Sequence, residues 1–140
     1  MKKITQLKQA NEMLNHLQKV ILELSKSDIE DLSQISSIYI EFLRLFDERV
    51  NKRNINKSEK MQMFILLVVM IYSKETFFGK KLKKGIRNKL ANILSIAPTQ
   101  ISYNLQVVLF LYSNYDNLRK DVDYFYGEIL KRIEKNNENS

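Results

Sequence analysis

The chain has 140 residues, of which 44% are hydrophobic and 28% charged, and its formal net charge is +7. This length suits one domain with a hydrophobic core, and the composition is that of a soluble globular protein. The absence of cysteine excludes disulfides and thiolate metal sites, and the single histidine, His16, cannot build a metal site by itself.

The scarcity of turn residues predicts the fold class. Three glycines and one proline, in a chain with long periodic apolar patterns, favour an all-α protein of five to six helices. We expect one helical domain over residues 1–133, with a helical hairpin over 1–50 and a core over 56–133. Residues 51–54 are the expected hinge between them, and residues 134–140 an expected flexible tail.

The first predicted helix carries a narrow apolar seam. Ser27 followed by Glu30 is a capping-box pattern, which predicts the start of a second helix with a broader apolar face. These two helices are expected either to form an antiparallel hairpin within the chain or to pair with a second copy, so we predict a homo-oligomer, with a dimer favoured. The seam residues recur at spacings of three and four, as in a coiled coil: Leu7, Ala10, Leu14, Leu17, Ile21 and Leu24.

A continuous apolar stretch over residues 63–72 predicts a buried element. It has about half the length that a membrane span requires. Asn56 followed by Glu59 is a helix-cap pattern, so we expect a central core helix over residues 57–74. Lys2 and Lys3 are not followed by an apolar run, which predicts no secretory signal. We therefore expect a cytoplasmic protein of a bacterial or phage-infected host cell, with no membrane contact.

Residues 74–89 are the most basic part of the chain. They hold seven basic residues against the single acidic residue Glu75, a net +6 within a chain of +7. Such a run either neutralises nucleic-acid phosphates or keeps a loop solvated. Phe77 and Phe78 within it are expected to be buried under the loop. The predicted DNA-phosphate contacts are Lys80, Lys81, Lys83, Lys84, Arg87 and Lys89.

Residues 87–106 have the pattern of two short helices that meet at a sharp turn. Ala91 is small where the helices would cross, and Pro98 opens the second helix, where a missing N–H costs nothing. Ser95 stands at the turn position usually held by glycine, and Ala97 at the usual capping position. The expected apolar contacts between the helices are Leu90, Leu94, Ile96, Ile101 and Leu105.

On these residues, the segment over 87–106 resembles the helix-turn-helix superfamily of DNA-binding proteins. The resemblance implies double-stranded DNA as the partner, with the second helix in the major groove. That helix is expected to continue to Tyr112 and to break at Ser113 and Asn114. A last helix over residues 116–133 presents Leu118, Val122, Phe125, Ile129 and Ile133 on one face. The predicted base-reading residues are Thr99, Gln100, Ser102, Tyr103 and Gln106.

The sequence gives no indication of an enzyme. It offers no nucleophile–base pair and no glycine-rich phosphate loop. The carboxylates of Asp116, Asp121 and Asp123 lie near the start of the last predicted helix, where acidic residues favour the helix dipole. We expect neither catalysis nor a cofactor nor a metal ion.

Three functions remain open. The first is a dimeric transcriptional regulator that reads two half-sites. The chain's length and its abundance of Asn, Ile and Lys resemble short proteins of phages and mobile elements from AT-rich bacteria. This likeness implies a second role, a DNA-packaging protein similar to the small subunit of a phage terminase, assembled as a larger ring. The third is a protein-interaction or structural module whose lysines meet an acidic protein surface.

Overall fold

The computed structural model describes residues 2–50 and 55–138, and these residues contain helices but no strand. The expected all-α fold of five to six helices is therefore confirmed. The predicted hinge over 51–54 lies outside the described residues. Two short 3₁₀ helices, η1 (Leu32–Gln34) and η2 (Lys74–Phe78), accompany the six α-helices, which are α1 (Lys2–Leu24), α2 (Ile35–Val50), α3 (Lys57–Tyr72), α4 (Ile86–Leu94), α5 (Pro98–Asn114) and α6 (Asp116–Glu138).

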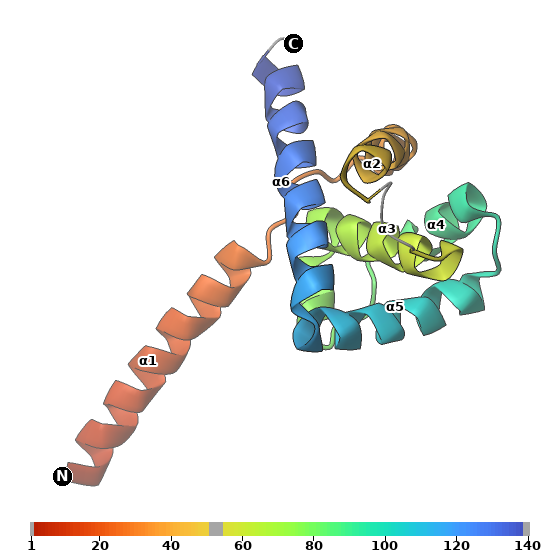
Figure 1. Cartoon of the computed structure of the whole chain (residues 1–140). Helices are drawn as coiled ribbons and strands as arrows, with labels where there is room; N and C mark the ends of the chain where they lie inside the picture. Colours follow the sequence, from red (N-terminus) through yellow and green to blue (C-terminus); the bar gives the residue numbers. More distant parts are fainter. Residues whose placement is uncertain (1, 51–54, 139–140) are drawn as a thin grey trace.

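Helix α3 is the centre of the fold and contacts α2, α5 and α6 (Figure 1). The Asn56 side chain accepts a hydrogen bond from the Glu59 backbone N–H at 2.8 Å, which confirms the predicted cap. Every residue from Gln62 to Val69 is buried. A helix that is apolar on all sides needs neighbours all round, and the other helices provide them.

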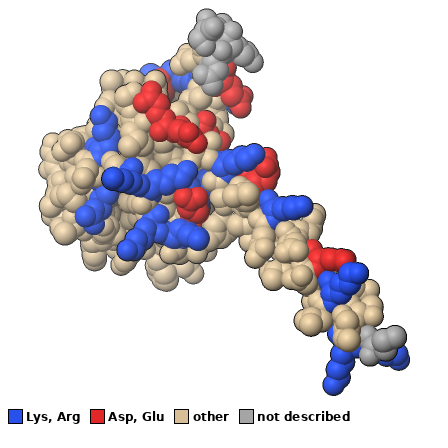
Figure 2. Space-filling model, turned by 180° about the vertical axis from the view of Figure 1, so that it is seen from behind, with Lys and Arg blue, Asp and Glu red and all other residues tan. Residues whose placement is uncertain are grey.

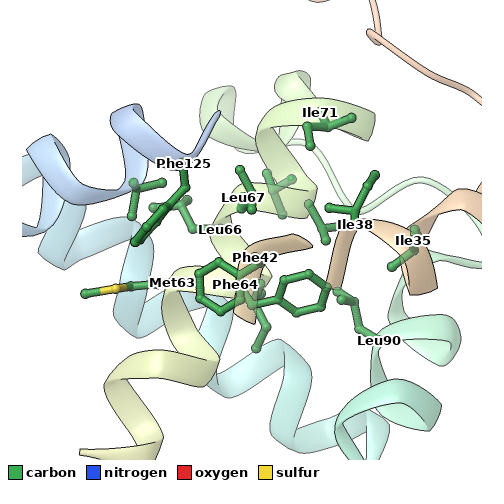
Figure 3. Close-up of a cluster of buried hydrophobic side chains, with 14 of the residues drawn as sticks. Ile35, Ile38, Phe42, Met63, Phe64, Leu66, Leu67, Ile71, Leu90 and Phe125 are labelled. Atoms are coloured by element: carbon green, nitrogen blue, oxygen red, sulfur yellow. The ribbon is translucent and has the colours of Figure 1, made fainter. Parts of the chain in front are cut away.

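Aromatic side chains from three helices meet in the core (Figure 3). The ring of Phe42 on α2 lies 5.4 Å from that of Phe64 on α3 and 5.3 Å from that of Phe125 on α6. Such tilted and edge-to-face contacts are the preferred aromatic geometries. The apolar face predicted for the last helix packs here, with Val122 and Ile129 also buried.

The expected N-terminal hairpin is not formed, because α1 projects away from the rest of the molecule (Figure 1). No residue of α1 is buried. The chain after α1 is instead fixed at the end of α3: the Asp28 backbone N–H donates to the Ile71 carbonyl at 2.9 Å, and Lys74 pairs with the Asp28 carboxylate at 3.0 Å. The broad apolar face of α2 packs on α3 and α6 instead of on α1. We call α2 to α6 the body and α1 the arm.

The predicted start of the second helix was also wrong. Ser27 does not cap a helix, because its hydroxyl donates to the Tyr72 carbonyl at 2.7 Å. The cap is Asp31, whose carboxylate accepts bonds from the Ser33 hydroxyl at 2.7 Å and the Ser33 N–H at 3.0 Å. These bonds lower the pKa of Asp31. The helical chain therefore begins at Leu32, as η1.

Three smaller differences concern segments around α5 and α6. Phe77 is half-buried against Tyr112, as expected, but Phe78 is 63% exposed because η2 points it outward. Helix α5 ends at Asn114, two residues beyond the predicted Tyr112, and the side chains of Ser113 and Asn114 donate to carbonyls four residues earlier. Helix α6 continues past Ile133 to Glu138, through part of the predicted tail.

The hydropathy of the described helices bears on whether any of them could span a membrane. No single helix there is long and apolar enough to cross a bilayer. Helices α4 and α5 reach such a length and composition only together, across a 100° bend.

Candidate nucleic-acid interface

Helices α4 and α5 meet at 100° across the turn formed by residues 95–97. Ser95 adopts the left-handed conformation, with φ 57° and ψ 45°. The backbone N–H groups of Ser95 and Ile96 both donate to the Ala91 carbonyl, which closes the end of α4. Two helices at about 90–120° joined by a three- or four-residue turn have the geometry of a helix-turn-helix.

The predicted apolar contacts hold these two helices together. Leu90 and Ala91 of α4 are buried, as are Ile101 and Leu105 of α5. Leu94 and Ile96 pack at the edge of the same core and stay partly exposed. The small side chain of Ala91 therefore lies where close approach of the helices requires it.

The start of α5 is stabilised without a capping side chain at Ala97. Pro98 is the first helical residue, as predicted. The Gln100 side-chain oxygen accepts a hydrogen bond from the Ala97 N–H at 3.3 Å, which is half of a capping box. Asn104, one turn later, donates to the Gln100 carbonyl at 2.8 Å and accepts from Gln62 of α3 at 3.0 Å. Gln100 therefore has a structural contact at the start of α5, although its side chain remains exposed.

Three of the other predicted base-reading residues form one exposed strip along α5, and Tyr103 in this strip lies about one turn from Gln100. Thr99, Tyr103 and Gln106 are exposed at spacings of four and three, so they share one helix face. Tyr103 is 68% exposed. The Ser102 hydroxyl is half-buried and accepts a hydrogen bond from the Arg87 guanidinium at 3.2 Å. This bond links α4 to α5 beside the predicted base-reading residues, whose surface we call the reading face.

An open groove of about 660 Å³ runs between the lysine-rich loop and this side of α5. Ser102 and Gln106 line it from α5, next to Leu105 and Leu109. Lys89 is half-buried on α4 and does not line the groove. Five of the six residues predicted to contact phosphate line this groove beside α5, namely Lys80, Lys81, Lys83, Lys84 and Arg87.

Most of the charge around this groove is not neutralised by the protein. Within the part of the chain that the structure describes, Lys80, Lys81 and Lys84 are exposed and have no carboxylate within ion-pair distance. Lys83 differs, because its ammonium donates to the Ser27 hydroxyl. Figure 2 shows Lys and Arg gathered in a band across one face of the body, with few acidic side chains among them. Such a band suits an anionic polymer.

Two glycines delimit the lysine-rich loop, and the sequence analysis did not use them. Gly79 and Gly85 both adopt left-handed conformations, with φ of 86° and 92°. At Gly85 a Cβ atom would lie only 2.8 Å from the end of the Leu32 side chain, so a larger residue would both strain the backbone and force this side chain to move. The placement of two of the three glycines around the lysines was the signal that could have predicted a shaped loop.

Two acidic residues near the start of α6 make structural contacts within the body. Asp121 is buried and pairs with Arg49 of α2 at 2.9 Å, and Asp123 accepts a hydrogen bond from the Tyr112 hydroxyl at 2.7 Å. The described residues contain no group of His, Cys, Asp and Glu side chains that could hold a metal ion. No protein-family model, curated protein or solved structure matches this chain.

Proposed function

We propose that this protein binds double-stranded DNA through the first half of α5, while the loop over residues 79–85 and the start of α4 hold the phosphate backbone. One observation carries the proposal: unpaired lysines line the same groove as Ser102 and Gln106 of the reading face. Phosphate contacts fix the register of a protein on the duplex, and side chains in the major groove then read the bases.

The orientation of α5 supports this use. Its first turn extends beyond the body's core, since every residue from Ala97 to Gln100 is exposed. The N-terminus of a helix attracts phosphate through its free N–H groups and its dipole. Gln106 has the amide that pairs with adenine in the major groove, and Tyr103 has a ring that covers a thymine methyl group or a hydroxyl that bonds a phosphate.

The role that fits this site best is a dimeric transcriptional regulator. Helix-turn-helix proteins commonly read two half-sites with two subunits. A DNA-packaging role similar to a phage terminase small subunit would use the same site in a larger ring. The oligomer size separates these roles, because a dimer favours the regulator and eight or more subunits favour packaging.

The proposal is tested by measuring how the affinity for a random-sequence duplex changes with salt, using fluorescence anisotropy. The double variant Lys80→Gln/Lys81→Gln should bind more weakly and should reduce the slope of log K against log salt by about 2, one for each lost phosphate contact. The matched control is Lys2→Gln/Lys3→Gln, which removes the same charge from the exposed start of the arm. Equal losses for both variants would contradict a localised interface.

Two exposed aromatic residues favour a second candidate, a protein-interaction surface. Tyr103 and Phe110 are 68% and 62% exposed and lie two helical turns apart on one face of α5. Large exposed apolar side chains often mark contacts with other proteins. If this is their role, the protein should fail to bind DNA even at low salt, and its contact with a protein partner should resist salt.

A further inference from the structure

The arm exposes an apolar seam that the body does not cover. Leu14, Leu17 and Ile21 are each 50–52% exposed, and Leu7 and Leu24 at the two ends are 71% and 67% exposed. Isolated helices gain little stability from hydrogen bonding alone and depend on the packing of an apolar face. The seam repeats every three and four residues, which is the repeat that packs against another helix of the same kind.

The order of large and small residues along the seam fits a second copy of the arm that runs in the opposite direction. With two arms centred on each other, Leu14 meets Leu17 of the second copy, and Leu7 meets its Leu24. Ala10, the one small seam residue, then meets Ile21 of the second copy, so a small side chain faces a large one. A parallel pair would place Ala10 against Ala10 and leave a gap, which close-packed cores avoid.

The residues beside the seam also favour the antiparallel direction. Met13 and Val20 flank it on one side, and Asn11 and Gln18 flank it on the other. In an antiparallel pair, like sides of the two helices adjoin, so Met13 lies near Val20 of the second copy and Asn11 near its Gln18. In a parallel pair Met13 would lie beside Gln18, which would place an apolar side chain against a polar one.

The charges of the arm are also complementary only in this direction. In the antiparallel register Lys8 is level with Glu23 of the second copy, and Glu12 is level with its Lys19. In a parallel pair each of these charges would be level with an identical charge. These residues are exposed and lie off the seam, so salt screens their attraction and they add only a small preference for this direction.

We infer that the protein forms a homodimer in which the two arms pair antiparallel, with the two bodies at opposite ends of the paired helices. The arm is about 35 Å long, at 1.5 Å per residue for its 23 residues. This inference does not depend on DNA binding, although it would supply the two subunits that the proposed regulator needs.

The oligomeric state is tested on the full chain, without DNA, by sedimentation equilibrium. The wild type should have twice the monomer mass, and the double variant Leu14→Asp/Leu17→Asp should be monomeric. The control Leu22→Asp changes an equally accessible leucine that lies off the seam and is 70% exposed, so it should stay dimeric. Because α1 contributes no buried residue, the urea unfolding curve of the body should be unchanged in all three proteins.

The direction of pairing is tested by disulfide crosslinking, for which the cysteine-free chain gives a clean background. Ala10→Cys alone should not crosslink to itself, but a mixture of Ala10→Cys and Ile21→Cys should form the mixed disulfide. A wild-type monomer at all concentrations, an assembly larger than a dimer, or self-crosslinking of Ala10→Cys would each overturn the inference. If the wild-type protein is a dimer but does not bind DNA, the proposed function is contradicted and this inference is not.

Discussion

Helices α1 and α3 are both long and rich in apolar residues, but they have opposite surroundings. Ten of the sixteen residues of α3 are buried, whereas none of the twenty-three residues of α1 is. The difference follows from the arrangement of the apolar residues. Those of α3 occupy every side of the helix and require a surrounding body, while those of α1 form one seam that requires one partner helix.

The largest expected difference between arm and body concerns packing. Leu67→Ala in α3 removes a fully buried side chain and should lower the free energy of unfolding by about 2–5 kcal/mol, through lost burial and a cavity. Leu17→Ala in α1 should change the unfolding of the body by less than about 0.5 kcal/mol. Urea denaturation of both variants measures this, and similar losses would mean that the arm packs on the body in solution.

Breaking an ion pair should also destabilise the protein more in the body than in the arm, but by less than the loss of core packing does. Asp121→Ala leaves the Arg49 guanidinium without its buried partner and should destabilise the body by about 1–3 kcal/mol. Glu23→Ala breaks an ion pair with Lys26 in which both side chains are exposed. It should lower the free energy of unfolding by between 0 and about 1 kcal/mol. Thermal unfolding compares the two, and an Asp121→Ala variant no less stable than Glu23→Ala would contradict the structural role of this pair.

DNA recognition should depend on the reading face of the body. Tyr103→Ala should weaken binding to a selected target site by about 1–3 kcal/mol without unfolding the protein. Phe110→Ala, a similarly exposed aromatic residue farther along α5, is the control and should change the affinity less. Titrations on target and random duplexes give both values. A loss from Tyr103→Ala that is equal on every DNA sequence would refute base reading by this residue.

The smallest expected effect is a loss of stability in alkali that is confined to the body. Burial, together with the hydrogen bond to Asp123, raises the pKa of Tyr112 to about 12 from the usual 10.0, and burial also raises the pKa of Tyr72. A raised folded-state pKa gives stability that is present below about pH 10 and is lost as the pH rises through about 12.

Urea unfolding of the wild type and of Tyr112→Phe across this range of pH tests the effect. The variant lacks the ionisable hydroxyl, so its stability should fall less steeply with pH than that of the wild type. Identical slopes for the two proteins would show that the Tyr112 environment does not carry the effect. The arm contains no tyrosine, so the ionisation of tyrosine should not change the stability of the arm.

The sequence was informative wherever a local signal determined the structure. The Asn56 cap, the turn at Ser95 with Pro98 after it, and the apolar face that includes Phe125 each lie where their residue patterns placed them. These features depend on residues within a few positions of one another, so single-sequence patterns are sufficient for them.

The sequence could not decide features that depend on distant residues. A seam such as that of α1 looks the same whether its partner is α2 or another chain. Ser27 resembles a helix cap until the Tyr72 carbonyl is brought beside it. The hydrogen bond between Gln62 and Asn104 joins α3 to α5 across 42 positions of the sequence, so no local pattern predicts it.

The most direct test of the central claim is the binding of the wild-type protein to a random-sequence duplex across a salt series. Four cations near the groove lack a carboxylate partner among the described residues: Lys80, Lys81, Lys84 and Arg87. If each contacts a phosphate, log K should fall against log salt with a slope of about −3 to −4. Absence of binding even at low salt would contradict the proposed DNA interface.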